Sequence, residues 1–466
     1  MPVFLAAAPL LAVLGALLLR QSALRASLVG VALAALVAIA AFGAQPGELA
    51  SATLAWWPLG LEVLAIVAGG LAFADAGRRS GGQRVLSGWL RRSLGAGIAP
   101  VLAIVHGVTP LAESLTGFGV GAAIAVPLLA ALGLDGRRAA VIGLLGLCAV
   151  PWGSMGPGTL IAAQLSGLGF DELGITSAVW SLPVFVGVGV AAALLVAEPG
   201  RRLRAVAAAS ASGLVLSAGV LGANLLIGTP PAGALGALAA LLLHLLVGAA
   251  RGRRPGLPRE AALAAAPYLL LIGGVVITML AVRAAGQSET AWRVLASPAV
   301  WLVIATVAAS GGRPRLLRAV APEVARRWWR VGPATALFLA LGIVMSASGM
   351  SQTLAAALAG LGGAYLLAVP AIGALGGFMT GSNSGANAMF AGPQAQAVTA
   401  IGADLLPAMA AHNVSAALFM MASPARVEMA VQLTSDRPRA SSVQRVVLVA
   451  DLAILAVLTV ALPFLA

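Results

Sequence analysis

The sequence predicts an all-α polytopic membrane protein with two inverted repeats, each containing a re-entrant hairpin and a broken transmembrane helix, and about 12 crossings. Three observations lead to this fold class. The 466-residue chain is 60% hydrophobic and only 9% charged, a composition that soluble domains do not have. Its apolar spans are long and continuous, and they end at clusters of Arg. The pattern Thr-Gly-x-x-x-Gly-Ala begins at Thr116 and again at Thr380.

The charge of the chain predicts a membrane surface as its partner. The formal net charge is +13, and it comes from Arg, because the sequence contains no Lys. Arg clusters in short loops indicate cytoplasmic ends and contact with the lipid bilayer, so nucleic acid is not an expected partner. Cys148 is the only cysteine, which excludes an internal disulfide and a cysteine metal cluster.

The first repeat is expected over residues 1–204. It begins with three crossings and an amphipathic segment on the inner membrane face. A hairpin, a crossing that is broken at 151–159 by two prolines and three glycines, and a return crossing follow. The expected ranges are 3–19, 27–42, 53–74, 80–94, 98–132 (hairpin), 139–166 and 175–196.

Residues 98–132 are too long for a single crossing. As one helix they would measure roughly 50 Å, against a hydrocarbon core of about 30 Å. Arg91 and Arg92 precede the stretch, and Arg137 and Arg138 follow it, so both ends are expected in the cytoplasm. A re-entrant hairpin with a glycine-rich tip satisfies both observations. Two closely packed glycine-rich helices are the structural alternative.

The second repeat is expected over residues 260–466, after a two-helix linker over 205–259. Its order is the same: crossings at 261–281, 294–309 and 332–350, a short helix at 352–361, a hairpin at 365–403, and crossings at 405–421 and 446–465. A basic segment at 313–330 is placed in the cytoplasm. Because each repeat crosses an odd number of times and the linker an even number, the repeats insert with opposite orientation.

Polar groups gather at the two tips and the two breaks, and they predict a site for a small anion. Hydroxyls, amides and free backbone N–H groups at half-helix N-termini suit a carboxylate better than a cation or a sugar. For Ser384 and Asn387, polar contacts between helices are the alternative. The candidate substrate-binding residues are Thr116, Gly117, Phe118, Gly119, Trp152, Ser154, Thr380, Ser382, Asn383, Ser384, Asn387, Asn413 and Ser415.

Glu113 and His412 are the candidates for proton coupling. A carboxylate at membrane depth must be paired, protonated or in contact with water, and His titrates near neutral pH. The alternative for Glu113 is a salt bridge or hydrogen bond that holds the hairpin, with His106 as a partner. For His412 the alternative is packing. Glu62 is expected to be a scaffold or dimer-contact residue.

Several of these segments resemble the L-lactate permease family. Glu113 with Gly117-Phe118-Gly119 and the run Pro-Leu-Leu-Ala-Ala-Leu-Gly at 127–133 is similar to one family signature. The run 377–384 with Asn-Ala-Met-Phe at 387–390, and then Ser423-Pro424, is similar to a second. The resemblance implies proton-linked uptake of lactate, glycolate or related monocarboxylates through the bacterial inner membrane. It also implies scaffold and transport domains, an elevator motion and a homodimer.

The predicted function is therefore secondary active transport of small monocarboxylates by proton symport, with no cofactor besides the coupling ion. A sodium-coupled carboxylate or organic anion transporter is the alternative, because hydroxyls, amides and carbonyls at hairpin tips also bind Na⁺. An enzyme is not expected, because the sequence lacks the G-x-G-D, H-E-x-x-H and P-loop motifs. No metal site is expected.

Overall fold

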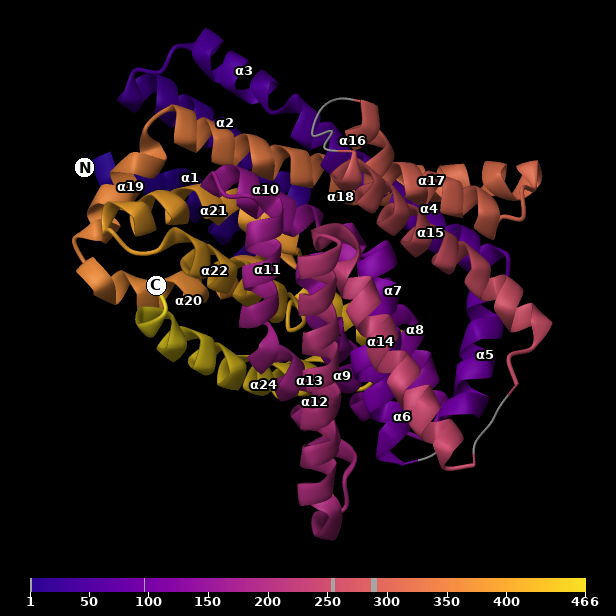
Figure 1. Cartoon of the computed structure of the whole chain (residues 1–466). Helices are drawn as coiled ribbons and strands as arrows, with labels where there is room; N and C mark the ends of the chain where they lie inside the picture. Colours follow the sequence, from indigo (N-terminus) through magenta and orange to yellow (C-terminus); the bar gives the residue numbers. More distant parts are fainter. Residues whose placement is uncertain (1, 96, 253–255, 286–290) are drawn as a thin grey trace.

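The computed structural model describes residues 2–95, 97–252, 256–285 and 291–466, and every regular element within these ranges is a helix (Figure 1). In this part of the chain 11 helices are long and apolar enough to cross a membrane, or up to 12 if the bent pair Phe170–Trp180 and Leu182–Val196 forms one span. The prediction of an all-α polytopic membrane protein is confirmed.

Helices from the start of each half form one packed layer. In the first half they are α1 (Pro2–Leu18), α2 (Ala23–Phe42), α3 (Pro46–Ala55), α4 (Trp57–Arg79) and α5 (Gly82–Leu94). In the second half they are α15 (Arg259–Ala284), α16 (Ala291–Ala296), α17 (Pro298–Ala309), α18 (Pro314–Ala347) and α19 (Met350–Ala359). Helix α18 packs against α2 and α4, and α17 packs against both α4 and α15; these helices lie close together in Figure 1. Within this layer Ser297 donates a hydrogen bond to Glu62 (3.2 Å), and the role of Glu62 as a scaffold or dimer-contact residue stays a prediction.

A helix–turn–helix unit lies at each predicted hairpin. In the first unit, α6 (Ile98–Ala103), a π-helical turn (Ile104–Val108) and α7 (Thr109–Thr116) lead to a tip at 117–119, and α8 (Val120–Ala131) returns. In the second unit, α20 (Ala368–Thr380) leads to a tip at 381–382, and α21 (Asn383–Ala400) returns. The two arms of each unit pack against each other. We call these units the first and second hairpin.

Each hairpin is followed by an interrupted crossing. After the first come α9 (Gly136–Leu145), an irregular stretch (Gly146–Met155) and α10 (Pro157–Ser166). After the second come α22 (Leu405–Met420), a break at 421–423 and α23 (Pro424–Gln432). The final crossings are α11 (Phe170–Trp180) with α12 (Leu182–Val196), and α24 (Ala440–Ala461). The two halves thus have the same order of elements.

The two-helix linker consists of α13 (Arg202–Leu226) and α14 (Thr229–Ala250). Helix α13 packs on α12, and α14 packs on α7 of the first hairpin. The linker is therefore part of the body around the first hairpin. Residues 253–255, near its predicted end, lie outside the described residues.

Two predicted boundaries in the packed layer are wrong. The crossing predicted to begin at residue 332 is part of a longer helix, because α18 also runs through the basic segment 313–330 without a break. Glu323 pairs with Arg326 and Arg327 at one helical turn (2.6 Å each), and Val320 and Val324 pack into an apolar cluster. This amphipathic pattern extends the helix beyond the apolar span.

The predicted start of the third crossing, at residue 53, is also wrong, because it is too early. Residues 53–55 belong to α3, and α4 starts at Trp57. Pro58 stands in the first turn of α4. A proline there lacks the N–H that would continue α3, so the chain begins a new helix at that point.

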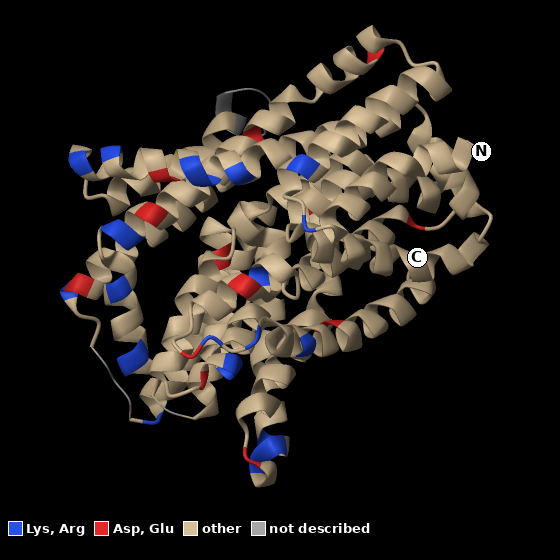
Figure 2. Cartoon of the chain, turned by 180° about the vertical axis from the view of Figure 1, so that it is seen from behind, with Lys and Arg blue, Asp and Glu red and all other residues tan. Residues whose placement is uncertain are grey.

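Arginine is distributed unevenly over the molecule. In Figure 2 most Arg-bearing segments lie toward the left and lower edge, and the region around both termini carries few of them. This distribution agrees with Arg-rich cytoplasmic ends and with both termini on the opposite side. The opposite insertion of the two halves stays a prediction.

Candidate functional site

Both hairpin tips and both helix breaks meet at one cavity, which we call the tip cavity. Its volume is about 150 Å³, roughly ten times what a single water molecule needs. Helix α18 closes one side with Thr335 and Phe338. Of the predicted site residues, eight line the tip cavity: Glu113, Gly117, Phe118, Ser154, Thr380, Ser382, Asn383 and Ser384.

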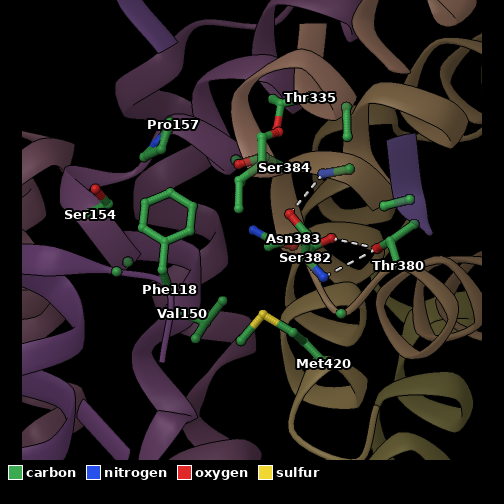
Figure 3. A pocket seen from close by; sticks show the side chains of 18 of the residues that line it. Phe118, Val150, Ser154, Pro157, Thr335, Thr380, Ser382, Asn383, Ser384 and Met420 are labelled. Atoms are coloured by element: carbon green, nitrogen blue, oxygen red, sulfur yellow. Dashed lines mark hydrogen bonds between the residues drawn. The ribbon is translucent and has the colours of Figure 1, made fainter. Parts of the chain in front are cut away.

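The two hairpin tips face each other across this cavity (Figure 3). Phe118, Ser154 and Pro157 lie on one side, and the residues from Ser382 to Ser384 lie on the other. Val150 and Met420 project between them and form an apolar floor (Figure 3). The cavity therefore combines polar tip residues with an apolar surface.

The first tip is a tight turn held by Glu113. Gly117, Phe118 and Gly119 all have positive φ (70°, 57° and 83°), a backbone conformation that glycine adopts without steric cost. Glu113 is 2% exposed, and its carboxylate accepts hydrogen bonds from the N–H groups of Gly119 (2.9 Å) and Gly121 (3.1 Å). Glu113 thus caps the start of α8, as its structural alternative expected.

His106 is not the partner of Glu113, so this part of the structural alternative is wrong. Its two ring nitrogens lie 2.8 Å from the hydroxyl of Ser212 and 2.8 Å from the carbonyl of Phe185. Ser212 in turn contacts His244 (2.8 Å). The π-helical turn points the imidazole toward α12 and α13, so it joins the first hairpin to the linker.

Two half-helices begin at the cavity. Ser382 caps α21 by accepting from the N–H of Gly385 (3.2 Å), and Ser384 lies in the first turn. Pro157 begins α10, and Gly158 lies so close to Asn383 that a Cβ atom there would be 2.7 Å from the amide nitrogen. The first N–H groups of a helix have no partner within that helix. Both helix dipoles therefore place partial positive charge at this cavity.

Two arginines also line the tip cavity, and both come from segments that the sequence placed at the cytoplasmic surface. Arg426, in the first turn of α23, donates a hydrogen bond to the carbonyl of Gly381 in the second tip (3.3 Å). Its guanidinium also lies near Gly119 of the first tip, whose N–H bonds to Glu113, and both charged side chains line the tip cavity. Arg330 reaches the cavity from α18. The position of Arg426 directly after the Ser423-Pro424 break was the signal that could have identified it.

A buried amide network lies behind the second tip. The Asn387 side-chain amide donates to the carbonyl of Gly158 (3.1 Å) and to Asn413 (2.9 Å), and Asn383 also donates to Asn413 (3.0 Å). Asn413 donates to Thr159 (3.0 Å) and Ser177 (3.1 Å). This network ties α21 and α22 of the second half to α10 and α11 of the first. Asn387 and Asn413 do not line the tip cavity.

Other predicted residues also lie outside the cavity lining. Thr116 and Ser415 donate to backbone carbonyls in their own helices (2.5 and 2.7 Å). Trp152 donates to Asn224 of the linker (3.4 Å). His412 is fully buried, and its ring nitrogen lies 2.8 Å from the Gln394 amide. Gly119 contributes its N–H to Glu113 instead of to the cavity.

The known proteins to which this chain is similar are described as L-lactate permeases. The family model of L-lactate permease matches residues 265–466. An L-lactate permease of Streptococcus iniae is 25% identical over 382 residues, which cover 75% of this chain and 79% of that protein. The L-lactate permease of Escherichia coli (strain K12) is 39% identical over 94 residues, and that of Salmonella typhi is 38% identical over 94 residues. These two alignments cover 20% of this chain and 17% of the relative.

The family match includes the second tip, the amide network residues of α21 and α22, and Arg426. The alignment with the streptococcal relative extends the similarity over most of the chain. Together with the 11 apolar helices in the described part of the chain, these matches show that the chain is a multi-pass membrane protein that is similar to L-lactate permeases over most of its length.

Proposed function

We propose that this protein is a secondary active transporter that carries lactate or a similar small monocarboxylate through the inner membrane. The observation that carries the proposal is the meeting of two helix N-termini and two arginines at a cavity of about 150 Å³. Both features favour an anion. The names of the relatives, all L-lactate permeases, support a carboxylate as the anion.

The chemistry of the cavity walls fits a 2-hydroxy acid. The carboxylate binds at Arg426 and at the first turn of α21, where charge-assisted hydrogen bonds are available. The Ser384 hydroxyl is placed to bond the substrate hydroxyl. Phe118, Phe338 and Met420 form the apolar wall for the methyl group.

The presence of Glu113 and Arg426 in the same cavity supports proton coupling. An ionised Glu113 compensates the guanidinium and competes with an incoming carboxylate. Protonation of Glu113 removes this competition, so one proton and one anion bind together. His412 would take part only indirectly, since its ring lies behind the second tip and outside the cavity lining.

Alternating access is proposed to occur by an elevator motion. The layer with α4 and α18 would stay fixed, and the two hairpins with their interrupted crossings would move. The cavity suits such a motion because one wall comes from α18 and the others come from the hairpins and breaks.

Uptake of labelled L-lactate into proteoliposomes tests the proposal. An imposed pH gradient, acidic outside, should drive accumulation above equilibrium, and a sodium gradient at constant pH should not. Accumulation driven by sodium alone would support the sodium-coupled alternative, for which the hydroxyl and amide oxygens at the tips are the candidate ligands. No uptake under either gradient, in protein that is folded and inserted, would contradict transport of lactate.

A further inference from the structure

A basic groove runs beside helix α5, away from the tip cavity. Its volume is about 410 Å³. Arg78, Arg84 and Arg91 stand along it, and α8 forms the opposite wall with Ile124 and Pro127. Next to the groove lies a second cavity of about 190 Å³. Gln83, Ser87 and Ile124 line both of them, so the groove and the cavity adjoin each other.

Two of the three arginines that line this groove have no ion-pair partner within the described part of the chain. Arg78 is paired with Asp75. Arg84 and Arg91 are exposed, and neither has an ion-pair partner among the described residues. They are seven residues apart on α5 and therefore lie on one face of the helix. The groove thus offers two guanidinium groups without ion-pair partners, about two turns apart on one face of α5.

The adjoining cavity is apolar. Seven leucines of α5, α14 and α15 line it, and Trp89 and Tyr268 contribute ring surface. The few polar side chains include Gln83, whose amide donates to the carbonyl of Ala74 (3.2 Å). An unfilled apolar space between helices loses van der Waals contacts. In a bilayer, a hydrocarbon chain is the natural occupant.

We propose that this site binds an anionic phospholipid, with the phosphate on Arg84 and Arg91 and one acyl chain in the apolar cavity. Charge complementarity selects an anionic headgroup, and basic clusters at the cytoplasmic membrane surface attract such lipids. The apolar cavity selects a lipid over free phosphate. The inference does not rest on the proposed transport function.

The position of the site implies that the bound lipid has a structural role. Helices α5 and α15 line the cavity on one side, and α7, α8 and α14 line it on the other. A bound chain therefore fills the space between the packed layer and the first hairpin. Binding stabilises the folded protein, because the lipid occupies a site that the unfolded chain lacks.

The test is thermal unfolding of the full-length protein in detergent, with added phosphatidylglycerol, phosphatidylcholine or inorganic phosphate. Phosphatidylglycerol should raise the unfolding temperature, and the two other additives should not. The apparent affinity for phosphatidylglycerol should fall about fivefold for each Arg removed in R84Q and R91Q. R92Q is the matched control, because Arg92 is an exposed neighbour on the same helix that does not line the groove.

A second variant tests the acyl-chain cavity independently. Ala265 lines this cavity from α15, and Ala265→Phe would fill it while leaving both arginines in place. It should abolish the stabilisation by phosphatidylglycerol without lowering the unfolding temperature in detergent alone. Equal shifts with both lipids, equal losses in R91Q and R92Q, or a full shift with inorganic phosphate would each overturn the proposal. So would an undiminished lipid effect in a folded Ala265→Phe variant.

Discussion

At the scale of single residues, Glu113 combines a structural and a proposed coupling role. Its carboxylate caps α8 through two backbone N–H groups of the first tip. It also lines the tip cavity together with Arg426, which bonds the second tip. Protonation would therefore weaken the cap and free the arginine together. The state of one carboxyl group would control both the anion site and the tightness of the tip.

Glu113→Gln separates coupling from binding. The amide keeps the size of the side chain and cannot release a proton, so exchange of lactate between equal pools should continue while uptake driven by a pH gradient is lost. An amide accepts through one oxygen only, so the cap on α8 should weaken by about 1 kcal/mol. Exchange and uphill uptake, measured in the same proteoliposomes, decide whether Glu113 has the coupling role. Retained uphill uptake rules out the coupling role.

Asp451 provides a second prediction at this scale. Its side chain is fully buried in α24, on the face that also carries Val447 and Ile454. Neither carboxyl oxygen has a hydrogen-bond partner in the described part of the chain. Asp451→Leu replaces an unsatisfied buried group by an apolar one, so thermal stability should stay equal or rise by about 1 kcal/mol. A clear fall in the unfolding temperature, relative to the exposed control Leu452→Ala, would show that Asp451 has a partner.

At the scale of elements, the two hairpins use polar residues in different ways. Ser384 lines the tip cavity, whereas Asn413 lies behind it and ties four helices together. Ser384→Ala should weaken lactate binding by about 1 kcal/mol, and it should leave stability nearly unchanged. Asn413→Ala should lower stability by about 2 kcal/mol or more, because it leaves buried amides and hydroxyls without partners.

Binding affinity and unfolding temperature, measured on both variants, test this distinction. The two substitutions serve as controls for each other, since each removes one polar group within the same pair of facing elements. If Asn413→Ala lost as much lactate affinity as is predicted for Ser384→Ala and kept full stability, Asn413 would be assigned to the binding site. A stable Ser384→Ala variant with unchanged affinity would assign Ser384 to helix packing.

The hairpins could be predicted from sequence, and the first break only in part. A stretch too long for one crossing and the repeated Thr-Gly-x-x-x-Gly-Ala pattern located both tips. The first break was expected from Pro151, yet the helix ends at Gly146. The residues Leu-Cys-Ala-Val after Gly146 carry no local signal for a break. Tertiary contacts determine it: Gly146 packs on Thr109, and Cys148 lies against the carbonyl of Val105 (3.8 Å).

The positions of the two arginines in the tip cavity are a second feature that could not be predicted from the sequence. Charge patterning assigns an Arg near the end of a span to the membrane surface. Arg330 reaches the cavity because α18 continues beyond its apolar part, and Arg426 does so because α23 begins at the break. Helix length and break position in three dimensions decide both cases. The pattern of hydrophobic spans along the sequence predicts neither the length of α18 nor the position of the break before α23.

At the scale of the whole molecule, the opposite insertion of the two halves is the main prediction. Arg137, after the first hairpin, and Ala400, at the end of the second, are exposed, and the single native Cys148 is buried. Arg137→Cys should react with an impermeant thiol reagent only from the cytoplasm, and Ala400→Cys only from outside. Wild-type protein provides the unlabelled control. Reaction of both positions from one face would contradict an inverted repeat.

The central claim is that the tip cavity binds a small carboxylate, and direct binding of L-lactate to purified protein tests it most closely. Arg426→Gln removes the cation that joins both tips, so affinity should fall about tenfold or more, in line with 1.5–3 kcal/mol for a hydrogen bond to a charged group. Arg445→Gln is the matched control, because Arg445 is exposed on α24 and does not line the cavity. Wild type and Arg445→Gln should bind equally. Wild-type affinity in a stably folded Arg426→Gln variant would contradict the claim.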